Sequence, residues 1–214
     1  MSLKEQMKNG LLYVEFGHSS EEDKEYEKLL ADQRLHCKDV LFEYNNNTRP
    51  SDLKRKDALL RQLLTDAGEE IWMESPVHMA YGCNVHIGSH FYSNFNLSLV
   101  DDGEIFIGDH CMIAPNVTIS TTGHPVDGEF RRKGTQFSLP IHIGNDVWIG
   151  SGAIILPGVT IGNNVVIGAG SVVTKDIPDN VVAYGEPCRV QRPITDYDKE
   201  YYRKGCKVNP DFDK

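Results

Sequence analysis

The sequence predicts a parallel β-helix, a coil of short strands, and three features of its pattern indicate this fold class. An aliphatic residue recurs every six positions between Ile141 and Pro178, at Ile143, Ile149, Ile155, Ile161, Ile167 and Val173. A smaller or β-branched residue lies two positions before each of them, and a glycine follows most of them. A helix has a period of 3.6 residues and a lone strand a period of 2, whereas period six fits one strand plus one corner.

The composition is that of an ordinary soluble globular protein. The chain has 214 residues, of which 40% are hydrophobic and 25% charged, enough for one large domain with an appendage. No apolar run reaches the roughly 18 residues of a membrane span, and the N-terminal segment MSLKEQMKNG lacks a signal-peptide core. We therefore expect a cytoplasmic protein that binds no membrane. The net charge of −9 disfavours a nucleic-acid partner, although a local basic patch can still bind an anionic cofactor.

The cysteine pattern argues against both a disulfide framework and a zinc knuckle. The cysteines are odd in number and have no CxxC spacing; they are Cys37, Cys83, Cys111, Cys188 and Cys206. We expect structural thiols. Cys111 lies two positions before the periodic residue Ile113, so it is expected to fill the core of the coil.

Residues 1–70 are predicted to form a helical cap. Ser19 and Glu22 have capping-box spacing ahead of a run whose apolar residues keep to one helical face. The segment NNNTRPS ends this helix, and Ser51 opens a second helix that stops near Gly68. A helical hairpin would cover the end of the coil, because unpaired strands need a cap. A role in closing over a substrate stays open.

The β-helix domain is expected over residues 71–192, and a C-terminal tail over 193–214. From Ile71 the pattern changes to strands and turns, with a two-residue turn at Asp102 and Gly103. The period of six is present on both sides of this turn, at Ile87, Ser93 and Leu99 and at Ile107, Ile113 and Ile119.

The polar segment 121–140 is predicted to be a loop that leaves the coil and returns to it. The period of six is lost after Ile119 and resumes at Ile143, and loops of this length inside a compact domain are usually functional. Within the loop, Pro125 biases His124 toward an extended backbone. A histidine with its usual pKa near 6.5 can accept a proton at neutral pH, so His124 is a candidate general base. Local sequence alone does not separate this role from a structural one.

Several segments together resemble the sugar O-acetyltransferases of the hexapeptide-repeat superfamily. They are the six-residue repeat, FYSNFNLSLVDDG, the TGHP loop, NDVWIGSGAIILPGVTIG and the tail GAGSVVTKDIPDNVVAYGEPCRV. The sequence is most similar to the galactoside and maltose acetyltransferases, and its N-terminal helices resemble the maltose-acetyltransferase cap region. The repeat alone would be a weak indication, since many acyltransferases contain it. Its combination with NFN, GHP and TKDIP is specific, and the similarity covers nearly the whole chain.

The resemblance implies a left-handed β-helix prism and a homotrimer whose active sites lie between neighbouring subunits. The period of six indicates neither the handedness nor the trimer, and parallel crossovers are normally right-handed. The resemblance also implies transfer of an acetyl group from acetyl-CoA to a sugar hydroxyl by direct attack. In this reaction His124 resembles the general base, and Asn94 resembles the group that stabilises the tetrahedral oxyanion.

Further positions match the binding contacts of this family. Asp102 resembles an acceptor for the sugar hydroxyls, and Tyr92 is expected to line the same cleft. Glu15 stands where the galactoside enzymes have an aspartate near the N-terminus. Ala80 replaces a serine that contacts the sugar, which leaves galactosides, maltose and glucosides open as acceptors. The positions that match CoA contacts, with cations expected at the phosphates, are Trp148, Ser151, Ala169, Thr174, Lys175, Arg189 and Arg192.

Two other functions stay open. One is O-acetylation of an antibiotic such as a streptogramin or chloramphenicol, although relatives of that kind usually lack a long helical cap. The other is a metal enzyme of the γ-carbonic-anhydrase type, or a scaffold on the same coil. A metal enzyme needs three convergent ligands. His86 and His90 have no third partner in the pattern, and His86 is expected to point outward from a strand, so we expect no metal site.

Overall fold

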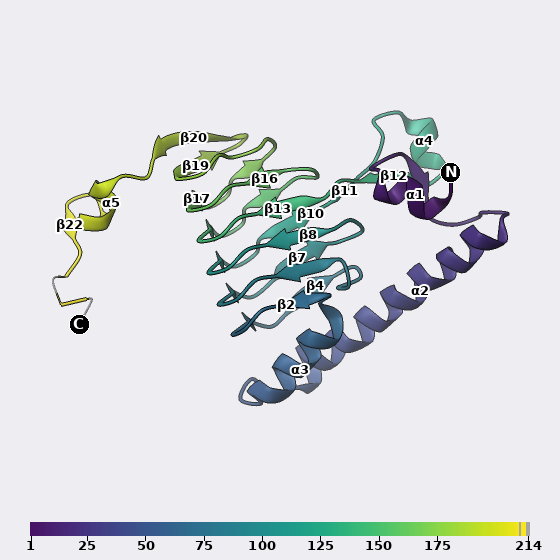
Figure 1. Ribbon diagram of the computed structural model, residues 1–214, viewed down its shortest axis with the longest axis horizontal. Helices are drawn as coiled ribbons and strands as arrows, with labels where there is room; N and C mark the ends of the chain where they lie inside the picture. The colour runs from purple at the N-terminus through teal and green to yellow at the C-terminus, as the bar shows by residue number, and fades with distance from the viewer. Residues whose placement is uncertain (210, 213–214) are drawn as a thin grey trace.

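The computed structural model describes residues 1–209, 211 and 212, and its chain winds into a left-handed parallel β-helix of about six turns (Figure 1). Helices cover one end and one edge of the coil, and a loop protrudes from it. The predicted fold class, a parallel β-helix with an N-terminal helical cap and a protruding loop, is therefore confirmed.

Short strands from successive turns line up in three sheets, which are parallel except for β20. Sheet 1 contains β2 (Asp66–Ala67), β5 (Val85–Ile87), β8 (Ile105–Ile107), β13 (Ile141–Ile143) and β16 (Thr160–Ile161). Sheet 2 contains β3 (Trp72–Met73), β6 (Tyr92–Ser93), β9 (Met112–Ile113), β14 (Trp148–Ile149), β17 (Val165–Ile167), β19 (Val181–Gly185) and β20 (Cys188–Pro193). Sheet 3 contains β4 (Val77–Met79), β7 (Leu97–Val100), β10 (Thr118–Ser120), β15 (Ile154–Ile155) and β18 (Val172–Val173).

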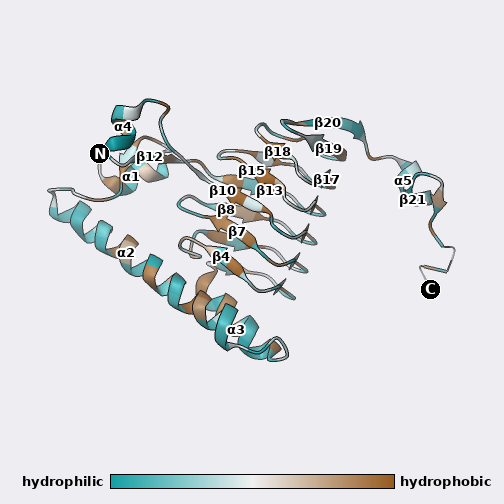
Figure 2. Cartoon of the chain, turned by 180° about the vertical axis from the view of Figure 1, so that it is seen from behind, coloured by the Kyte–Doolittle hydropathy of each residue, from teal (hydrophilic) through white to brown (hydrophobic). Residues whose placement is uncertain are grey.

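The aliphatic residues of the six-residue period form the core of the coil. They stack in register from turn to turn, as Ile107, Ile143 and Ile161 do in sheet 1. Each of these three side chains is at most 4% exposed, and burying one isoleucine contributes roughly 1.5–3 kcal/mol. Cys111 is also buried in this core, as its position in the period predicts. Figure 2 shows the hydrophobic residues concentrated on the strands of the coil.

A ladder of side-chain hydrogen bonds fixes the corner between sheets 1 and 2. The Oδ1 atom of Asp109 accepts from the backbone N–H of Ser89 at 2.7 Å, and Asn145 Oδ1 accepts from Asp109 at 2.8 Å. Asn163 and Asp179 repeat the contact in the next two turns. Asn145 and Asn163 are 18 residues apart, whereas Asp109 and Asn145 are 36 residues apart. The ladder therefore continues without a break past the protruding loop.

The N-terminal cap contains α1 (Leu3–Lys8), α2 (Glu21–Phe42), the π-helical turn η1 (Glu43–Asn47) and α3 (Leu53–Leu63). Ser20, rather than the predicted Ser19, caps α2, and Asp52 rather than Ser51 caps α3, because these side chains accept the free N–H groups of the first turn. Helix α3 stops before the predicted Gly68, since Asp66 already pairs with His86 in sheet 1.

The cap buries apolar side chains against the coil. Leu59, Leu60 and Leu63 of α3 are at most 3% exposed and belong to the same hydrophobic cluster as the coil residues. Helix α2 runs obliquely past the edge of the strands (Figure 2). Although α2 has 22 residues, no helix in the described part of the chain is long and apolar enough to cross a membrane.

The protruding loop is ordered rather than structureless. It contains β11 (Thr122–Gly123), α4 (Gly128–Arg132) and β12 (Thr135–Ser138), and β12 pairs antiparallel with both β11 and the N-terminal strand β1 (Tyr13–Val14). At its base the N–H of Leu139 donates to the carbonyl of Thr121 at 2.8 Å. The chain therefore returns to the coil where it left.

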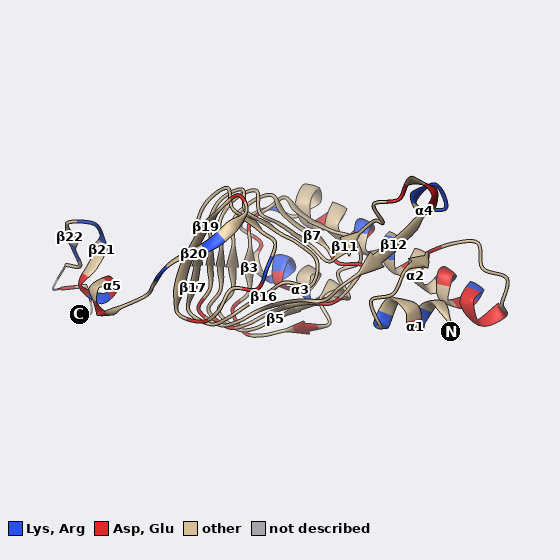
Figure 3. Ribbon diagram, turned by 90° about the horizontal axis from the view of Figure 1, so that it is seen from above, with Lys and Arg blue, Asp and Glu red and all other residues tan. Residues whose placement is uncertain are grey.

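The C-terminal arm extends from the coil on the side opposite to the cap and the loop (Figures 1 and 3). It follows β20 and contains α5 (Asp196–Glu200) and the hairpin of β21 (Tyr201–Arg203) and β22 (Cys206–Lys207). Residues 210, 213 and 214 of the predicted tail lie outside the described residues.

Candidate active site

His124 lies between β11 and α4 with one ring nitrogen engaged and the other free. Its Nδ1 atom is 3.0 Å from the carbonyl oxygen of Thr135. Because a carbonyl can only accept, Nδ1 carries the proton and Nε2 keeps a lone pair. The residue is exposed, and Nε2 has no protein partner in the described part of the chain.

The backbone before His124 is held by close packing in the loop. A Cβ atom on Gly123 would lie 2.5 Å from Cζ of Phe137, the register partner of Gly123 on β12. Any larger residue at this position would force the Phe137 ring to shift. The loop therefore holds the imidazole of His124 at a defined place.

Asn94 follows β6 at the corner between sheets 2 and 3. Its Oδ1 atom accepts a hydrogen bond from the N–H of Phe95 at 2.9 Å, which fixes the orientation of the amide. The Nδ2 group has no protein acceptor among the described residues, so two N–H donors are available. Asn94 can therefore donate to a developing oxyanion.

The structure brings Asp102 and Glu15, two of the residues predicted to bind the substrate, close together. Arg34 of α2 links them, because its Nη2 atom lies 2.7 Å from Glu15 Oε1 and 3.7 Å from Asp102 Oδ1. The hydroxyl of Tyr81 donates to Glu15 Oε1 at 2.7 Å. Only about a tenth of each carboxylate side chain is exposed.

Burial governs the electrostatics of Asp102. It raises the pKa of this carboxyl above its usual range, while a hydrogen bond from Thr122 and the charge of Arg34 act in the opposite direction. The negative charge of Glu15 raises the pKa further. Arg34 is therefore the main cation that favours an ionised Asp102.

The neighbouring Asp101 has a different function. It is fully buried and accepts from the backbone N–H groups of Ala80, Tyr81 and Gly82 at 2.6–3.0 Å. Burial raises the pKa of Asp101, and these three donors lower it. Asp101 therefore fixes the turn that presents Ala80 and Tyr81.

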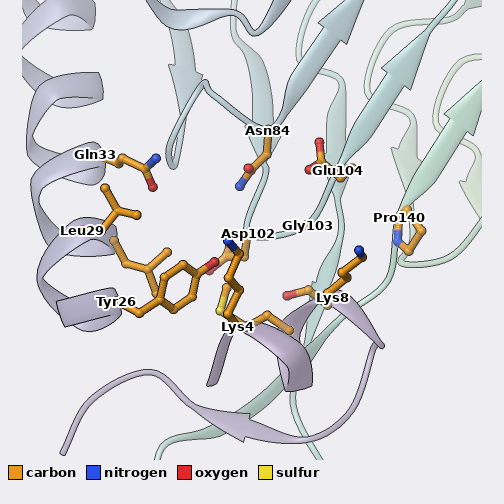
Figure 4. Close-up of a pocket in the computed structure, with 13 residues that line it drawn as sticks. Lys4, Lys8, Tyr26, Leu29, Gln33, Asn84, Asp102, Gly103, Glu104 and Pro140 are labelled. Carbon is orange, nitrogen blue, oxygen red and sulfur yellow. The ribbon is translucent and has the colours of Figure 1, made fainter. Parts of the chain in front are cut away.

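A cavity of about 450 Å³ lies between the cap and the coil, with Asp102 and Gly103 in its wall (Figure 4). Tyr26, Leu29 and Gln33 of α2 form one side of it. The remaining labelled residues come from α1 and from the coil; they are Lys4, Lys8, Asn84, Glu104 and Pro140. Neither Asn94 nor His124 lines this cavity, so within one chain the two candidate catalytic groups are separate from it.

Two aromatic candidates lie on one outward column of sheet 2. Tyr92, Met112 and Trp148 are register partners on β6, β9 and β14. Tyr92 is half-buried, whereas Met112 and Trp148 are 53% and 51% exposed. Trp148 is therefore available for contact with a ligand or a neighbouring subunit.

The other CoA candidates lie on the later turns of the coil. Ser151 and Ala169 are exposed at the corner between sheets 2 and 3, one turn apart, and Thr174 and Lys175 follow β18. Arg189 on β20 is exposed and donates to the carbonyl of Cys188.

Arg192, by contrast, is already paired. It forms two hydrogen bonds of 2.7 and 2.8 Å with the carboxylate of Asp198 on α5. These bonds lower the pKa of Asp198 to about 2. A phosphate would have to share this guanidinium with Asp198.

Three residues of the carboxylate cluster were missed by the sequence analysis. Arg34 and Tyr81 contact Glu15 directly, and Asp101 fixes the turn before Tyr81. None belongs to a local motif, and Arg34 shares a helix with many other charged residues. The DD pair at positions 101 and 102 was the only available signal.

The histidines of the coil have carboxylate or aromatic neighbours. His86 lies on the outer face of sheet 1, as expected, and its ring nitrogens are 2.6 Å from Asp66 and 2.7 Å from Glu104. His90 is 2.9 Å from Glu70 and stacks on His110. Among the residues that the structure describes, no group of three or more His, Cys, Asp or Glu side chains is arranged to hold a metal ion.

Comparison with known proteins places the chain among the transferases. Residues 140–175 match the bacterial transferase hexapeptide family (six repeats), and residues 6–68 match the maltose acetyltransferase hexapeptide capping motif. A galactoside O-acetyltransferase of Escherichia coli K12 is 50% identical over 179 residues, which cover 84% of this chain and 88% of that protein.

Solved structures give the same result. A galactoside acetyltransferase in complex with coenzyme A has a TM-score of 0.88 and 48% identity, covering 98% of this chain and 99% of that chain. A maltose O-acetyltransferase from Clostridium difficile 630 has a TM-score of 0.83 and 43% identity, and the match covers 91% of this chain and 98% of that chain.

The coil, its cap and its loop thus define a hexapeptide-repeat transferase. At this identity and coverage, the chain belongs to the family of hexapeptide-repeat sugar O-acetyltransferases that includes the galactoside and maltose enzymes. The resemblance seen in the sequence is confirmed.

Proposed function

We propose that this protein transfers the acetyl group of acetyl-CoA to a hydroxyl group of a sugar, with His124 as the general base. The observation that carries the proposal is the free Nε2 lone pair of an exposed histidine whose Nδ1 is bonded to Thr135. The galactoside and maltose enzymes among its relatives, and a relative bound to coenzyme A, support the reaction and the acetyl donor. A reaction that consumes acetyl-CoA also supports the predicted cytoplasmic location.

The proposed reaction is a direct attack of the sugar on the thioester. His124 Nε2 removes the proton of the sugar hydroxyl as its oxygen bonds to the acetyl carbonyl carbon, which is worth typically ~10²–10⁴ in rate. Asn94 Nδ2 donates to the resulting oxyanion, worth about 3 kcal/mol at comparable sites. When the carbon–sulfur bond breaks, the protonated His124 returns its proton to the CoA sulfur. The products are the acetylated sugar and free CoA.

The acceptor is proposed to bind at the carboxylates of Asp102 and Glu15, with Tyr92 beside them. Ionised carboxylates accept hydrogen bonds from hydroxyl groups, and those of this pair are held in place by Arg34. Ala80 occupies the position of a serine that contacts the sugar in the galactoside enzymes, and its side chain has no hydroxyl group. The proposal therefore includes glucosides and maltose as acceptors beside galactosides.

Acetyl-CoA is proposed to lie along the later turns of the coil. Trp148 would flank the thioester end, and the small side chains of Ser151 and Ala169 leave room for the pantetheine arm beside Thr174. Lys175 and Arg189 supply cations for the phosphates. Arg192 would contribute while keeping its contact with Asp198.

The active form is proposed to be a homotrimer with its active sites between subunits. Within one chain, no hydrogen bond connects Asn94 with His124, and neither lines the cavity at Asp102. The exposed apolar side chains of Met112 and Trp148 are also better buried by a second copy. A site that needs His124 from one subunit and Asn94 from the next accounts for both observations.

Acetyl-CoA turnover against a panel of mono- and disaccharides tests the proposal. Free CoA thiol and acetylated product are measured with galactosides, glucosides and maltose, and chloramphenicol serves as a non-sugar acceptor. Sugar-dependent thiol release and an acetylated sugar are expected. The proposal of a sugar acetyltransferase would be refuted if only chloramphenicol were acetylated, or if none of the acceptors tested were acetylated.

A further inference from the structure

We infer that Arg34 is a positioning residue of the acceptor site, through which helix α2 of the cap sets the geometry of Glu15 and Asp102. The inference rests on the proposed function, since it takes these two carboxylates as the sugar-binding groups. It also assigns a function to the cap beyond covering the end of the coil.

Arg34 contacts three segments that are distant in the sequence. Its Nη2 atom lies 2.7 Å from Glu15 after β1, 2.5 Å from the Tyr81 hydroxyl after β4, and 3.7 Å from Asp102 after β7. The guanidinium also lies over the Tyr81 ring, with 4.7 Å between its carbon and the ring centroid. One side chain of the cap therefore ties the N-terminal segment to two turns of the coil.

Arg34 supplies the positive charge that both carboxylates, Glu15 and Asp102, contact. Asp102 is largely buried, and the negative charge of Glu15 beside it disfavours its ionised form. Asp101 is not a free partner, because three backbone N–H groups already bind it. The other polar or titratable groups near Asp102 are Tyr13, Tyr81, Thr122, Glu104, Lys4 and Lys8. Among the described residues, none of these groups forms an ion pair with Asp102, whereas Arg34 does.

Loss of the guanidinium would affect sugar binding in two ways. Glu15 would keep only the hydroxyl of Tyr81 as an anchor, so the segment after β1 would move away from Asp102. Asp102 would protonate at higher pH, and a protonated carboxyl accepts hydroxyl groups less well. Both effects act on the acceptor and leave the acetyl-CoA residues of the later turns untouched.

The test compares Arg34→Met, Arg34→Lys and a matched control, Arg55→Met, in the full-length enzyme. Methionine keeps an apolar stem over Tyr81 without the charge, and lysine restores one cation. Arg55 is a cap arginine on α3, 3.7 Å from Glu43, with no contact to the carboxylate cluster. Steady-state kinetics are measured with the sugar that gives the highest wild-type turnover.

For Arg34→Met we expect kcat/KM for the sugar to fall at least tenfold, mainly through KM, with KM for acetyl-CoA changed less than twofold. The acidic limb of the pH profile should move to higher pH, and Arg34→Lys should restore part of both changes. Arg55→Met should behave like the wild type. An unchanged sugar KM and pH profile in Arg34→Met would overturn the inference.

Hydrogen exchange provides a readout that does not depend on activity. Amides of residues 13–18 should exchange faster in Arg34→Met than in the wild type, while amides of the later turns stay protected. Equal protection of residues 13–18 would also overturn the inference. A wild-type enzyme that acetylates no sugar would instead refute the proposed function, so the two failures are distinguishable.

Discussion

The hydroxyl groups of Tyr13 and Ser138 lie 2.8 Å apart and join residues that are 125 positions apart in the chain. Tyr13 belongs to β1 of the N-terminal segment, and Ser138 ends β12 of the loop that carries His124. Both side chains are buried. The N-terminal segment therefore supports the loop that places the candidate general base.

Tyr13→Phe should weaken this support. It removes the bond to Ser138 and also the acceptor of Gln136 Nε2, which lies 3.0 Å from the Tyr13 hydroxyl. Loss of a buried hydrogen bond costs about 1 kcal/mol, so the free energy of unfolding from urea titrations should fall by that amount. We expect kcat to fall several-fold, since the loop becomes less well held. Tyr202→Phe, in the exposed C-terminal arm, is the control, and equal stability of both variants would contradict the prediction.

His124→Asn should abolish most turnover without weakening acetyl-CoA binding. The amide of asparagine can still donate to Thr135, but it offers no base for the sugar hydroxyl. We expect kcat to fall by ~10² or more, with KM for acetyl-CoA nearly unchanged. His36→Asn, on the exposed face of α2, controls for the loss of an imidazole. Full turnover in His124→Asn would remove this residue from the proposed mechanism.

Asn94→Asp separates a catalytic donor from a turn residue. Aspartate can still accept the N–H of Phe95 and hold the corner, but it cannot donate to an oxyanion. Removal of one such donor typically lowers kcat by ~10²–10³. Asn116→Asp is the control, since Asn116 Oδ1 likewise accepts a hydrogen bond, from Asn96. If Asn94 were only a turn residue, Asn94→Asp would keep wild-type kcat.

Arg189→Gln should raise KM for acetyl-CoA by about tenfold, the equivalent of ~1.4 kcal/mol for one lost charge-assisted contact to a phosphate. The change should be smaller at high salt, because screening already weakens this contact in the wild type. kcat should stay within twofold. Lys207→Gln in the C-terminal hairpin is the control, and a KM that does not change for Arg189→Gln would place the phosphates elsewhere.

His86 should make the stability of the coil depend on pH. Partial burial lowers the pKa of this imidazole, but the hydrogen bonds that its N–H groups donate to the carboxylates of Asp66 and Glu104 outweigh burial and raise the pKa above its usual value. A raised folded pKa means that the stabilisation is complete below the unfolded pKa of about 6.5 and is lost as pH rises through the folded pKa. His86→Gln should therefore lose ~1 kcal/mol of unfolding free energy at pH 5.5 and less at pH 9. A difference that is constant across this range would contradict the assignment.

Most of the coil was predictable because its core repeats. Each turn buries the same kind of residue at the same spacing, so Ile143, Ile149 and Ile155 reveal the architecture without knowledge of any distant contact. The helix boundaries were less predictable. Ser19 and Ser20 are both good caps, and the choice of Ser20 depends on where the helix meets α1 through the bond from Leu3 to Asp23.

The site was predictable only where a local motif marks it. The TGHP and NFN segments identified His124 and Asn94, and the structure adds which of their atoms are free. Arg34 and Tyr81 could not be found in this way, because their roles come from contacts between the cap and the coil, such as the bond of Arg34 to Tyr81 across 47 residues, and from their shared contact with Glu15. Residue type and spacing do not encode such pairings.

The hydrogen-bond ladder between sheets 1 and 2 passes from Asp109 to Asn145 across 36 residues in the same way as it passes between partners 16 to 20 residues apart in the other turns. The loop is thus an insert about one turn in length, closed at its base by Leu139 and Thr121. Its length and sequence can change without shifting the register of any strand, provided that these two residues still meet. The coil therefore tolerates changes within the segment that carries His124, and a loop exchanged between relatives should leave the strands of the coil unaltered.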